Sequence, residues 1–318
     1  MNAGAPVARD VTVIVPAYNA AATLAAALRS VAAQTVRARE VLVVDDGSQD
    51  DTVGVAEREL AGLPHGRCLR LGRNCGPAAA RNAALAEARG AWLAFLDADD
   101  AWLPWRLERQ WSRAEMAADV ALWCGRTVPL AGDVVSAAVD GLPAVGSVLT
   151  RRLCLEEFAE HNPVATSTVL VRTAAVASVG GFDPAFRGPE DYELWMRLVA
   201  RHSACYADEP LAAYRNRAGS LSMDERRFLP EVLRVLEKAF GPGGVLAERQ
   251  DLRRRAVANQ FWNTSWMAFN RGARSAALRH YVRAVLADRR VGGARKLALL
   301  WRYLVGRPDE EGRAKEVS

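Results

Sequence analysis

The feature that most constrains the fold is an alternation of short β-branched runs and helical patterns over the first hundred residues. Apolar runs typical of buried strands lie at residues 11–15, 41–44, 68–71 and 91–96, and the segments between them have apolar residues at helical spacing. Strands that alternate with helices predict right-handed βαβ units. The sequence therefore predicts an α/β protein, Rossmann-like, with a mostly parallel sheet and helices on both faces.

Beyond residue 100 the pattern becomes more helical. Helices are expected over residues 105–116 and 192–201, and a strand over residues 166–171. From about residue 226 the pattern is helical throughout, with arginine at the polar positions. We therefore expect two domains, an α/β domain over residues 1–225 and a basic helical region over residues 226–318.

Charge is divided unequally between these two regions. The net charge of the chain is +5, but residues 1–225 carry −6 and residues 226–318 carry +11. The composition, 50% hydrophobic and 25% charged, excludes collagen-like and disordered classes. A basic segment on an acidic body favours an anionic partner such as a membrane surface. No nucleic-acid-binding motif accompanies the charge, so nucleic acid is not an expected partner.

The sequence also carries signals about the compartment. It contains no run of 18 apolar residues, so we expect no transmembrane helix. Residues 1–10 lack the basic start and apolar middle of a signal peptide. The five cysteines are scattered without a CxxC pair, as is usual in a reducing compartment. We expect a cytoplasmic protein.

Polar and acidic side chains follow three of the predicted strands. They lie in the segments Pro16–Asn19, Asp45–Ser48 and Asp97–Asp100. The carboxyl ends of parallel strands meet at one edge of a sheet, where open α/β sheets bind ligands. A divalent metal ion with a nucleotide diphosphate would neutralise these acids. Neither GxGxxG nor GxxxxGK[ST] occurs, which argues against dinucleotide and P-loop sites.

These segments resemble family 2 glycosyltransferases. The resemblance covers about residues 10–222 and rests on VTVIVPAYNAAATLAAALRSVAAQT, VLVVDDGSQDDT, GPAAARNAAL, AWLAFLDADDAWLPWRL, GGFDPAFRGPEDYELWMRL and PLAAYRNRAGSLS, in this order. It implies a GT-A fold for residues 1–225. It also implies an inverting, metal-dependent hexosyltransferase that moves a sugar from a nucleotide diphosphate sugar, with UDP-sugar as the default, to an acceptor hydroxyl. Polysaccharide or glycoconjugate biosynthesis is the expected context.

The resemblance assigns the chemical roles by motif. Asp97 and Asp99 form the DXD motif that holds Mn²⁺ or Mg²⁺, and Asp191 is the base that takes the acceptor proton. Glu190 binds the acceptor or fixes its loop. Without the resemblance, Glu190 and Asp191 would be explained as acidic residues that stabilise a helix N-terminus.

Other positions are assigned to the nucleotide. Tyr18 lies beside the base, Asp46 accepts a hydrogen bond from the base imide, and Asp97 also contacts the ribose. The alternatives are a buried strand-end aromatic for Tyr18, a turn carboxylate for Asp46 and a surface helix charge for Arg81. The full set of expected nucleotide-binding residues is Pro16, Tyr18, Asn19, Asp46, Arg81, Asp97 and Arg217.

Two departures from the family pattern qualify the resemblance. The Gln-x-x-Arg-Trp motif of processive synthases is absent after Asp191, which favours transfer of single sugars. Arg217 stands where many relatives have a histidine beside the metal. Arginine cannot bind a metal ion but can neutralise a diphosphate, so the third protein ligand of the metal is in question.

The acceptor is not identified by the sequence, because acceptor loops vary within a fold. A glycan, a lipid-linked or polysaccharide precursor, a protein and a small molecule all stay open as acceptors. Trp102 follows the DXD motif closely and either lines the acceptor site or belongs to the core. For residues 226–318 we retain two alternatives, a peripheral contact with a membrane and a helical bundle that packs on the α/β domain or in a homodimer.

Two other functions are alternatives for the chain as a whole. A sugar-phosphate nucleotidyltransferase would need a glycine-rich loop with a lysine after the first strand, which residues 13–19 lack. A non-catalytic nucleotide-binding or interaction protein of the same fold would not need Asp97, Asp99 and Asp191 intact.

Overall fold

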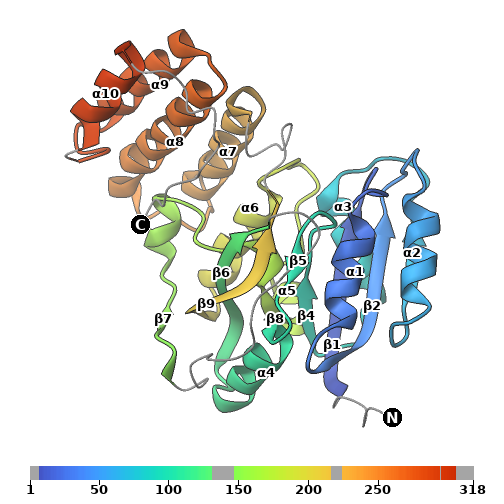
Figure 1. Ribbon diagram of the computed structural model, residues 1–318. Coiled ribbons are helices and arrows are strands. Elements are labelled where there is room, and N and C mark those ends of the chain that lie inside the picture. Colours follow the sequence, from blue (N-terminus) through green and yellow to red (C-terminus); the bar gives the residue numbers. More distant parts are fainter. Residues whose placement is uncertain (1–6, 131–146, 216–223, 294, 306–318) are drawn as a thin grey trace. The chain divides into compact units, whose positions relative to one another are not determined.

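The computed structural model describes residues 7–130, 147–215, 224–293 and 295–305. The chain forms two compact units, which Figure 1 traces in sequence colours. Unit 1 comprises Met1–Cys154 and Pro163–Asn216, and unit 2 comprises Leu155–Asn162 and Arg217–Ser318.

Unit 1 is built on one sheet, to which nine strands contribute within the described residues. The strands are β1 Val7–Ala17, β2 Arg37–Asp45, β3 Arg67–Arg70, β4 Trp92–Phe95, β5 Ala101–Trp102, β6 Val120–Pro129, β7 Thr150–Arg152, β8 Leu170–Arg172 and β9 Ser203–Tyr214. Their order is β3-β2-β1-β4-β8-β6-β9-β5, with β7 paired to β9. The α/β prediction is confirmed.

The sheet is parallel only in part. Strands β3, β2, β1 and β4 run parallel, as the alternating pattern predicts. Strand β8 is antiparallel to both β4 and β6, and β5 and β7 are antiparallel to β9. The sheet is therefore mixed, because the segments after residue 100 do not continue the βαβ repeat.

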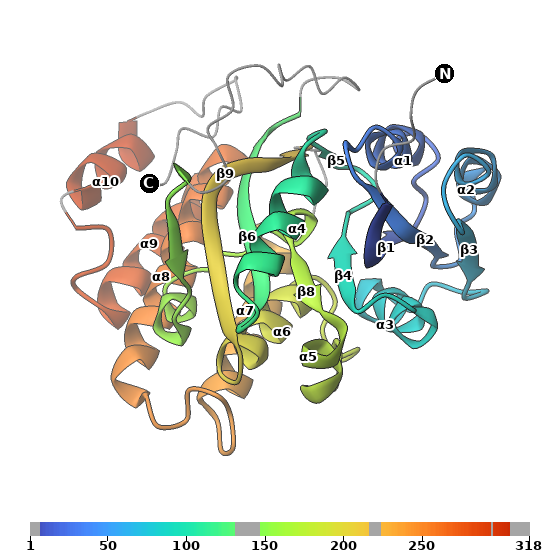
Figure 2. The same cartoon turned by 90° about the horizontal axis from the view of Figure 1, so that it is seen from below.

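Helices cover both faces of this sheet. They are α1 Leu24–Ala32, α2 Thr52–Leu60, α3 Pro77–Glu87, α4 Arg106–Met116, α5 Thr173–Ser178 and α6 Glu190–Val199. Figure 2 shows α1 and α2 on one side of the parallel strands and α3 on the other. Leu24, Leu28 and Val31 of α1 pack with the β1 valines in one core. On the opposite face the Phe95 ring lies 5.6 Å from the ring of Phe182.

The structure corrects the prediction for residues 166–171. Thr166–Thr168 form a short 3₁₀ helix, η3, and the strand β8 begins only at Leu170. The β-branched residues at 166, 168, 169 and 171 suggest a strand, but Thr168 N donates to Ala165 O at 2.9 Å and closes a turn instead. Two hydroxyl groups of this turn donate hydrogen bonds to acidic residues that the sequence analysis singles out.

Unit 2 contains a short 3₁₀ helix, η2 Leu155–Ala159, and four described helices. These are α7 Glu225–Phe240, α8 Gln250–Asn270, α9 Arg274–Ala287 and α10 Arg295–Val305. Each helix from α7 onward packs against the next. Gly292 has φ +71°, and a Cβ there would lie 2.2 Å from the Trp262 ring, so glycine is required between α9 and α10. Within the described chain, no helix is long and apolar enough to cross a bilayer.

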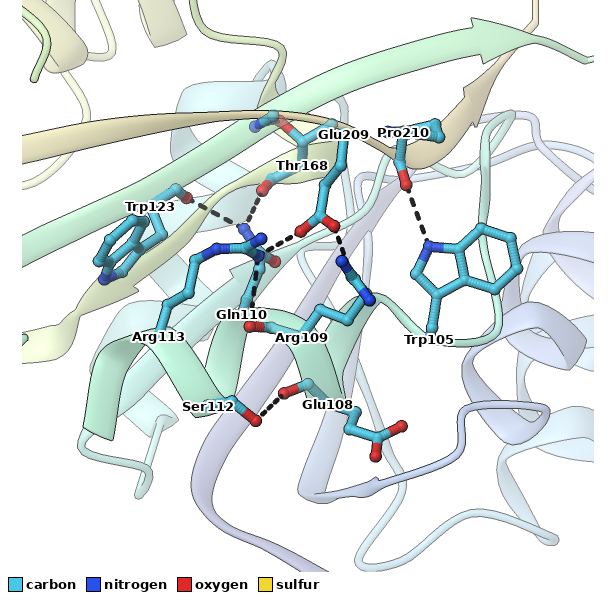
Figure 3. A network of polar contacts seen from close by, with 11 residues as sticks. Trp105, Glu108, Arg109, Gln110, Ser112, Arg113, Trp123, Thr168, Glu209 and Pro210 are labelled. Carbon is cyan, nitrogen blue, oxygen red and sulfur yellow. Dashed lines mark hydrogen bonds and ion pairs between the residues drawn. The ribbon is translucent and has the colours of Figure 1, made fainter. Parts of the chain in front are cut away.

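Helix α4 contacts the sheet through arginines as well as leucine. Arg109 Nε and Arg113 Nη1 both donate to the carboxylate of Glu209, which lies on β9, about 100 residues later in the chain (Figure 3). All three side chains are buried. Arg106 lies on the same face, with its guanidinium 3.8 Å from the Trp102 ring centre. A single carboxylate therefore serves as the counter-charge of two buried guanidinium groups.

We predict that replacing Glu209 with Gln strongly destabilises the fold. The substitution keeps the size of the side chain but leaves the two guanidinium groups buried without a counter-charge. Removing one partner of a buried ion pair costs about 3–5 kcal/mol in the free energy of unfolding. Urea unfolding of the full chain measures this loss.

A matched control is Glu57→Gln, because Glu57 pairs with Arg70 at the surface, 2.5 Å away. Both side chains are more than half exposed, so the expected loss is below about 1 kcal/mol. Equal small losses in the two variants would contradict a structural role for the Glu209 network.

Candidate active site

The register of the parallel strands places three loops at one edge of the sheet. Ala17, at the end of β1, pairs with Asp45, at the end of β2. Asp46 N donates to Ala17 O at 2.8 Å, and Leu96 N donates to Ile14 O at 3.1 Å. The loops after β1, β2 and β4 therefore leave the sheet side by side, as the sequence predicts.

The acidic residues after β2 hold backbone in place. Asp46 is buried, and its two carboxylate oxygens accept hydrogen bonds from Cys75 N at 2.7 Å and Gly76 N at 2.8 Å. Asp45 accepts from Ser48 N at 3.2 Å. Gly47 has φ +75°, and a Cβ there would lie 2.5 Å from backbone of Arg73. Asp45 thus fixes its own turn, whereas Asp46 holds the distant loop before α3, and the contact of Asp46 with the nucleotide base stays a prediction.

The loop after β1 is joined to the loop after β2. Asn19 N donates to Ser48 Oγ at 2.9 Å, and Asn19 Oδ1 accepts from Gln49 N at 2.8 Å. Tyr18 is 46% exposed, so its ring is available to a ligand and is not the buried aromatic of the alternative explanation. Pro16 is partly buried at the end of β1.

Arg81 lies at the centre of the site and is not a surface charge. It is buried on α3, where Nη1 donates to Glu190 Oε1 at 2.5 Å and Nη2 donates to Asp97 Oδ1 at 2.7 Å. Burial acts to lower the pKa of Arg81, but Asp97, Glu190 and Asp191 outweigh it and raise the pKa. Arg81 thus connects the DXD motif to the start of α6.

The three acidic residues after β4 have different surroundings. Asp97 and Asp99 are partly exposed, whereas Asp100 is buried. Asp100 accepts from Ser167 Oγ at 2.7 Å and from Arg215 N at 3.0 Å. Burial, followed by repulsion from Asp97 and Asp99, raises the pKa of Asp100 to about 8. Asp100 is therefore mostly protonated at neutral pH.

Asp191 is half-buried in the first turn of α6. Its Oδ2 accepts from Thr166 Oγ1 at 2.7 Å, and its Oδ1 accepts from Tyr192 N at 2.6 Å. Burial and the neighbouring Glu190 raise the pKa of Asp191 to about 6. Glu190 is fully engaged, since its second oxygen accepts from Gly188 N at 2.7 Å. Glu190 thus fixes the loop before α6.

Two site residues, Thr166 and Ser167, were not identified from the sequence. Thr166 donates to Asp191, while Ser167 Oγ donates to Asp100 and accepts from Asp97 N at 3.1 Å. These neighbouring residues of η3 therefore hold Asp191 and the loop after β4 from one turn. The only signal in the sequence is the run Thr166-Ser167-Thr168, three hydroxyl residues in what is otherwise an apolar strand pattern.

Trp102 occupies a core position. Its side chain is 1% exposed, its Nε1 donates to Ser167 O at 3.0 Å, and Arg106 covers its ring. This packing favours the core alternative over contact with an acceptor. Arg217 lies outside the described residues, so its expected contact with a diphosphate remains a prediction.

The donor set suits a metal ion that is shared with a ligand. Within the described ranges, no group of three or more His, Cys, Asp or Glu side chains is placed to hold a metal ion. Asp97 and Asp99 supply two partly exposed carboxylates. Mg²⁺ is commonly bound by one or two carboxylates together with substrate phosphates, so these residues fit an ion that arrives with a nucleotide diphosphate.

We predict that Asp46→Asn destabilises the protein in the absence of any ligand. An amide has one oxygen, so either Cys75 N–H or Gly76 N–H would face an NH₂ group in a buried place. The expected loss in the free energy of unfolding is about 1–3 kcal/mol, measured with urea. Asp51→Asn, at an exposed residue of the same loop, is the control. Unchanged stability with weakened nucleotide binding would instead indicate that the Asp46 carboxylate contacts the nucleotide base.

Curated relatives agree with the motifs. Residues 12–136 match the profile described as Glycosyl transferase family 2. The succinoglycan biosynthesis protein ExoO of Rhizobium meliloti (strain 1021) is 34% identical over 243 residues, which cover 73% of this chain and 68% of ExoO. The Escherichia coli UDP-Glc:alpha-D-GlcNAc-diphosphoundecaprenol beta-1,3-glucosyltransferase WfaP is 28% identical over 233 residues, covering 71% of this chain and 85% of WfaP. Some other relatives are matched over only 30% or 59% of their length.

Solved structures agree in fold. S. aureus TarS 1–349 in complex with UDP-GlcNAc has a TM-score of 0.62 and 18% identity, covering 93% of this chain and 88% of that one. The mannosyltransferase PcManGT from Pyrobaculum calidifontis in complex with GDP-Man and Mn²⁺ has a TM-score of 0.57 and 20% identity, covering 94% and 82%. These likenesses confirm the predicted GT-A fold. The identity to ExoO, together with the profile match over residues 12–136, shows that the chain belongs to glycosyl transferase family 2.

Proposed function

We propose that this protein is an inverting, non-processive glycosyltransferase that moves one sugar from a nucleotide diphosphate sugar to an acceptor hydroxyl. The observation that carries the proposal is the double connection between the DXD loop and Asp191. Arg81 bridges Asp97 and Glu190 on one side, and Thr166 and Ser167 hold Asp191 and Asp100 on the other. Two groups of acids that are about 90 residues apart are thus fixed as one unit.

Asp191 acts as the base in this proposal. The acceptor oxygen bonds to the anomeric carbon of the sugar while the bond from that carbon to the diphosphate oxygen breaks. The acceptor proton passes to an oxygen of Asp191, and the nucleoside diphosphate departs with the bonding electrons. A carboxylate with a pKa of about 6 is ionised at neutral pH, which suits it to this role.

The donor is bound at the ends of β1, β2 and β4. The exposed ring of Tyr18 lies beside the base, and Asp97 and Asp99 would hold Mn²⁺ or Mg²⁺ against the diphosphate. The chemistry that such an ion supplies is neutralisation of charge on the departing diphosphate. The solved relatives named above bind UDP-GlcNAc and GDP-Man, and a UDP-sugar is the donor we propose here. Arg217 adds a positive charge for the diphosphate.

The acceptor is proposed from the relatives' own names. ExoO takes part in succinoglycan biosynthesis, and WfaP acts on a diphosphoundecaprenol-linked sugar. A glycan or a lipid-linked glycan precursor is therefore the acceptor class that we propose, in polysaccharide or glycoconjugate synthesis on the cytoplasmic side of a membrane.

The direct test is hydrolysis of nucleotide sugars, because water can replace an unknown acceptor. We expect the full chain with Mn²⁺ to release nucleoside diphosphate from one UDP-sugar among UDP-, GDP- and dTDP-sugars, and chelation to abolish release. Asp191→Asn is expected to lower turnover about a hundredfold or more while donor binding by calorimetry is retained. Asp99→Asn is expected to lose metal-dependent donor binding.

Asp208→Asn is the matched control, since it makes the same chemical change on an exposed residue of β9. It is expected to turn over like the native chain. Donor binding without turnover in the native chain, with every donor, would favour a non-catalytic nucleotide-binding protein. An Asp191→Asn variant within severalfold of native turnover would remove Asp191 from the reaction.

The hydrogen bond from Thr166 leads to a separate prediction about pH. Deprotonated Asp191 is the active form, so kcat/KM is expected to fall as pH drops below about 6. The Thr166 hydroxyl and Arg81 favour the charged carboxylate, whereas burial and Glu190 oppose it. Thr166→Val removes one favourable contact and raises the pKa of Asp191. We expect kcat/KM to fall roughly two- to tenfold at pH 6 and to change little at pH 8.

Two control substitutions distinguish a change in the pKa of Asp191 from a general loss of stability. Thr166→Ser keeps the hydroxyl and should restore the native pH profile. Thr168→Val changes an equally buried threonine of η3 whose hydroxyl donates to Ala165 O at 2.7 Å, away from Asp191. Thr168→Val should lower the free energy of unfolding without shifting the acidic limb of the pH profile of kcat/KM. A Thr166→Val profile that superimposes on the native one would show that Thr166 does not act on the base.

A further inference from the structure

Large apolar side chains are exposed together on the last two described helices. Within the described chain, eight large hydrophobic side chains are exposed, and five of them lie between residues 282 and 304. Leu286 is 79% exposed, Leu297 78% and Trp301 68%. We call the five residues the C-terminal apolar group: Val282, Leu286, Leu297, Trp301 and Leu304.

The C-terminal apolar group is not needed for the core of unit 2. Val282 and Leu286 are four residues apart on α9, whereas Ala277, Tyr281 and Ala284 of the same helix are buried. Leu297, Trp301 and Leu304 are spaced by four and three residues on α10, and Tyr303 of that helix packs into the core. Each helix therefore uses one face for the core and presents apolar residues on another.

Positive charge surrounds the C-terminal apolar group. Residues 274–305 contain eight Lys and Arg and a single acidic residue, Asp288. Six of the arginines are exposed: Arg274, Arg279, Arg283, Arg289, Arg290 and Arg295. Exposed Trp and Leu beside exposed Arg are typical of helices that lie in the interface of an anionic bilayer.

The positive charge around the C-terminal apolar group also indicates which kind of partner covers it. A second copy of the chain would bring the same surface against itself and oppose arginine with arginine. An anionic lipid surface supplies the complementary charge and accepts the apolar side chains in the same contact. We propose that α9 and α10 attach the protein peripherally to an anionic lipid surface. This inference goes beyond the proposed reaction and does not depend on it, because attachment requires neither donor nor acceptor.

The test is co-sedimentation of the full chain with vesicles of phosphatidylcholine containing zero, 15 or 30% phosphatidylglycerol. We expect binding that increases with anionic lipid and weakens as salt is raised. Leu297→Ser with Trp301→Ser is expected to lower the partition coefficient about tenfold or more, because two apolar side chains no longer enter the bilayer. Arg289→Glu with Arg290→Glu is expected to remove most of the salt-sensitive binding.

Matched controls are available in unit 1. Met116 is as exposed as Trp301, at 68%, so Met116→Ser tests the loss of an equally exposed apolar side chain. Arg37→Glu with Arg89→Glu makes the same charge change as the Arg289 and Arg290 pair, at exposed arginines of unit 1. Both controls should bind vesicles like the native chain. All substituted residues are exposed, and thermal unfolding checks that each variant remains folded.

Three results would overturn the proposal. The full chain would stay in the supernatant at every lipid composition in low salt, or the control variants would lose binding as much as the C-terminal variants. In the third, Leu297→Ser with Trp301→Ser would convert a dimer to a monomer in light scattering while vesicle binding stayed unchanged. That result would assign the C-terminal apolar group to a second copy of the chain.

Discussion

The interaction on which the rest of the site depends is the pair of ion pairs that Arg81 makes with Asp97 and Glu190. Each carboxylate comes from a different part of the chain, and each would repel the other without the guanidinium between them. Burial destabilises the charged guanidinium of Arg81, and the two carboxylates compensate for this cost. Since Asp99 and Asp191 also lie at the site, one buried arginine leaves an excess of negative charge. A metal ion and the cationic side chains that meet a diphosphate are suited to balance that excess.

The carboxylates of the site form two groups in the structure that the sequence does not distinguish. Asp46 and Glu190 use their oxygens on backbone N–H groups and on Arg81, and they fix loops. Asp97, Asp99 and Asp191 remain partly exposed and are the ones we assign to chemistry. What separates the two groups is exposure, because Asp46 and Glu190 are buried whereas the other three carboxylates can still be reached by a ligand. A sequence gives no direct view of that environment.

Features that depend on consecutive residues are predictable from the sequence, and features that depend on distant partners are not. The sequence predicted the parallel strands, their helices and the family, because apolar runs and local motifs consist of consecutive residues. The strand β9 and the turn η3 were not, since they depend on partners far away: Thr166 is held by Asp191, and β9 is joined to α4 through Glu209. Helix α4 was predicted as a helix, but not that it buries three arginines. Trp102 was ambiguous because a tryptophan near a DXD motif suits a sugar site and a core equally well, and only its 1% exposure separates them.

The charge of the whole chain is a poor guide to where it can bind. A net charge of +5 combines −6 in residues 1–225 with +11 in residues 226–318. At an ionic strength of about 0.1 M, charges act over only about 10 Å, so a charged surface responds to the residues that face it and not to the total. An anionic bilayer would repel the acidic body and attract the segment over residues 274–305. Any attachment therefore has to be local to that segment.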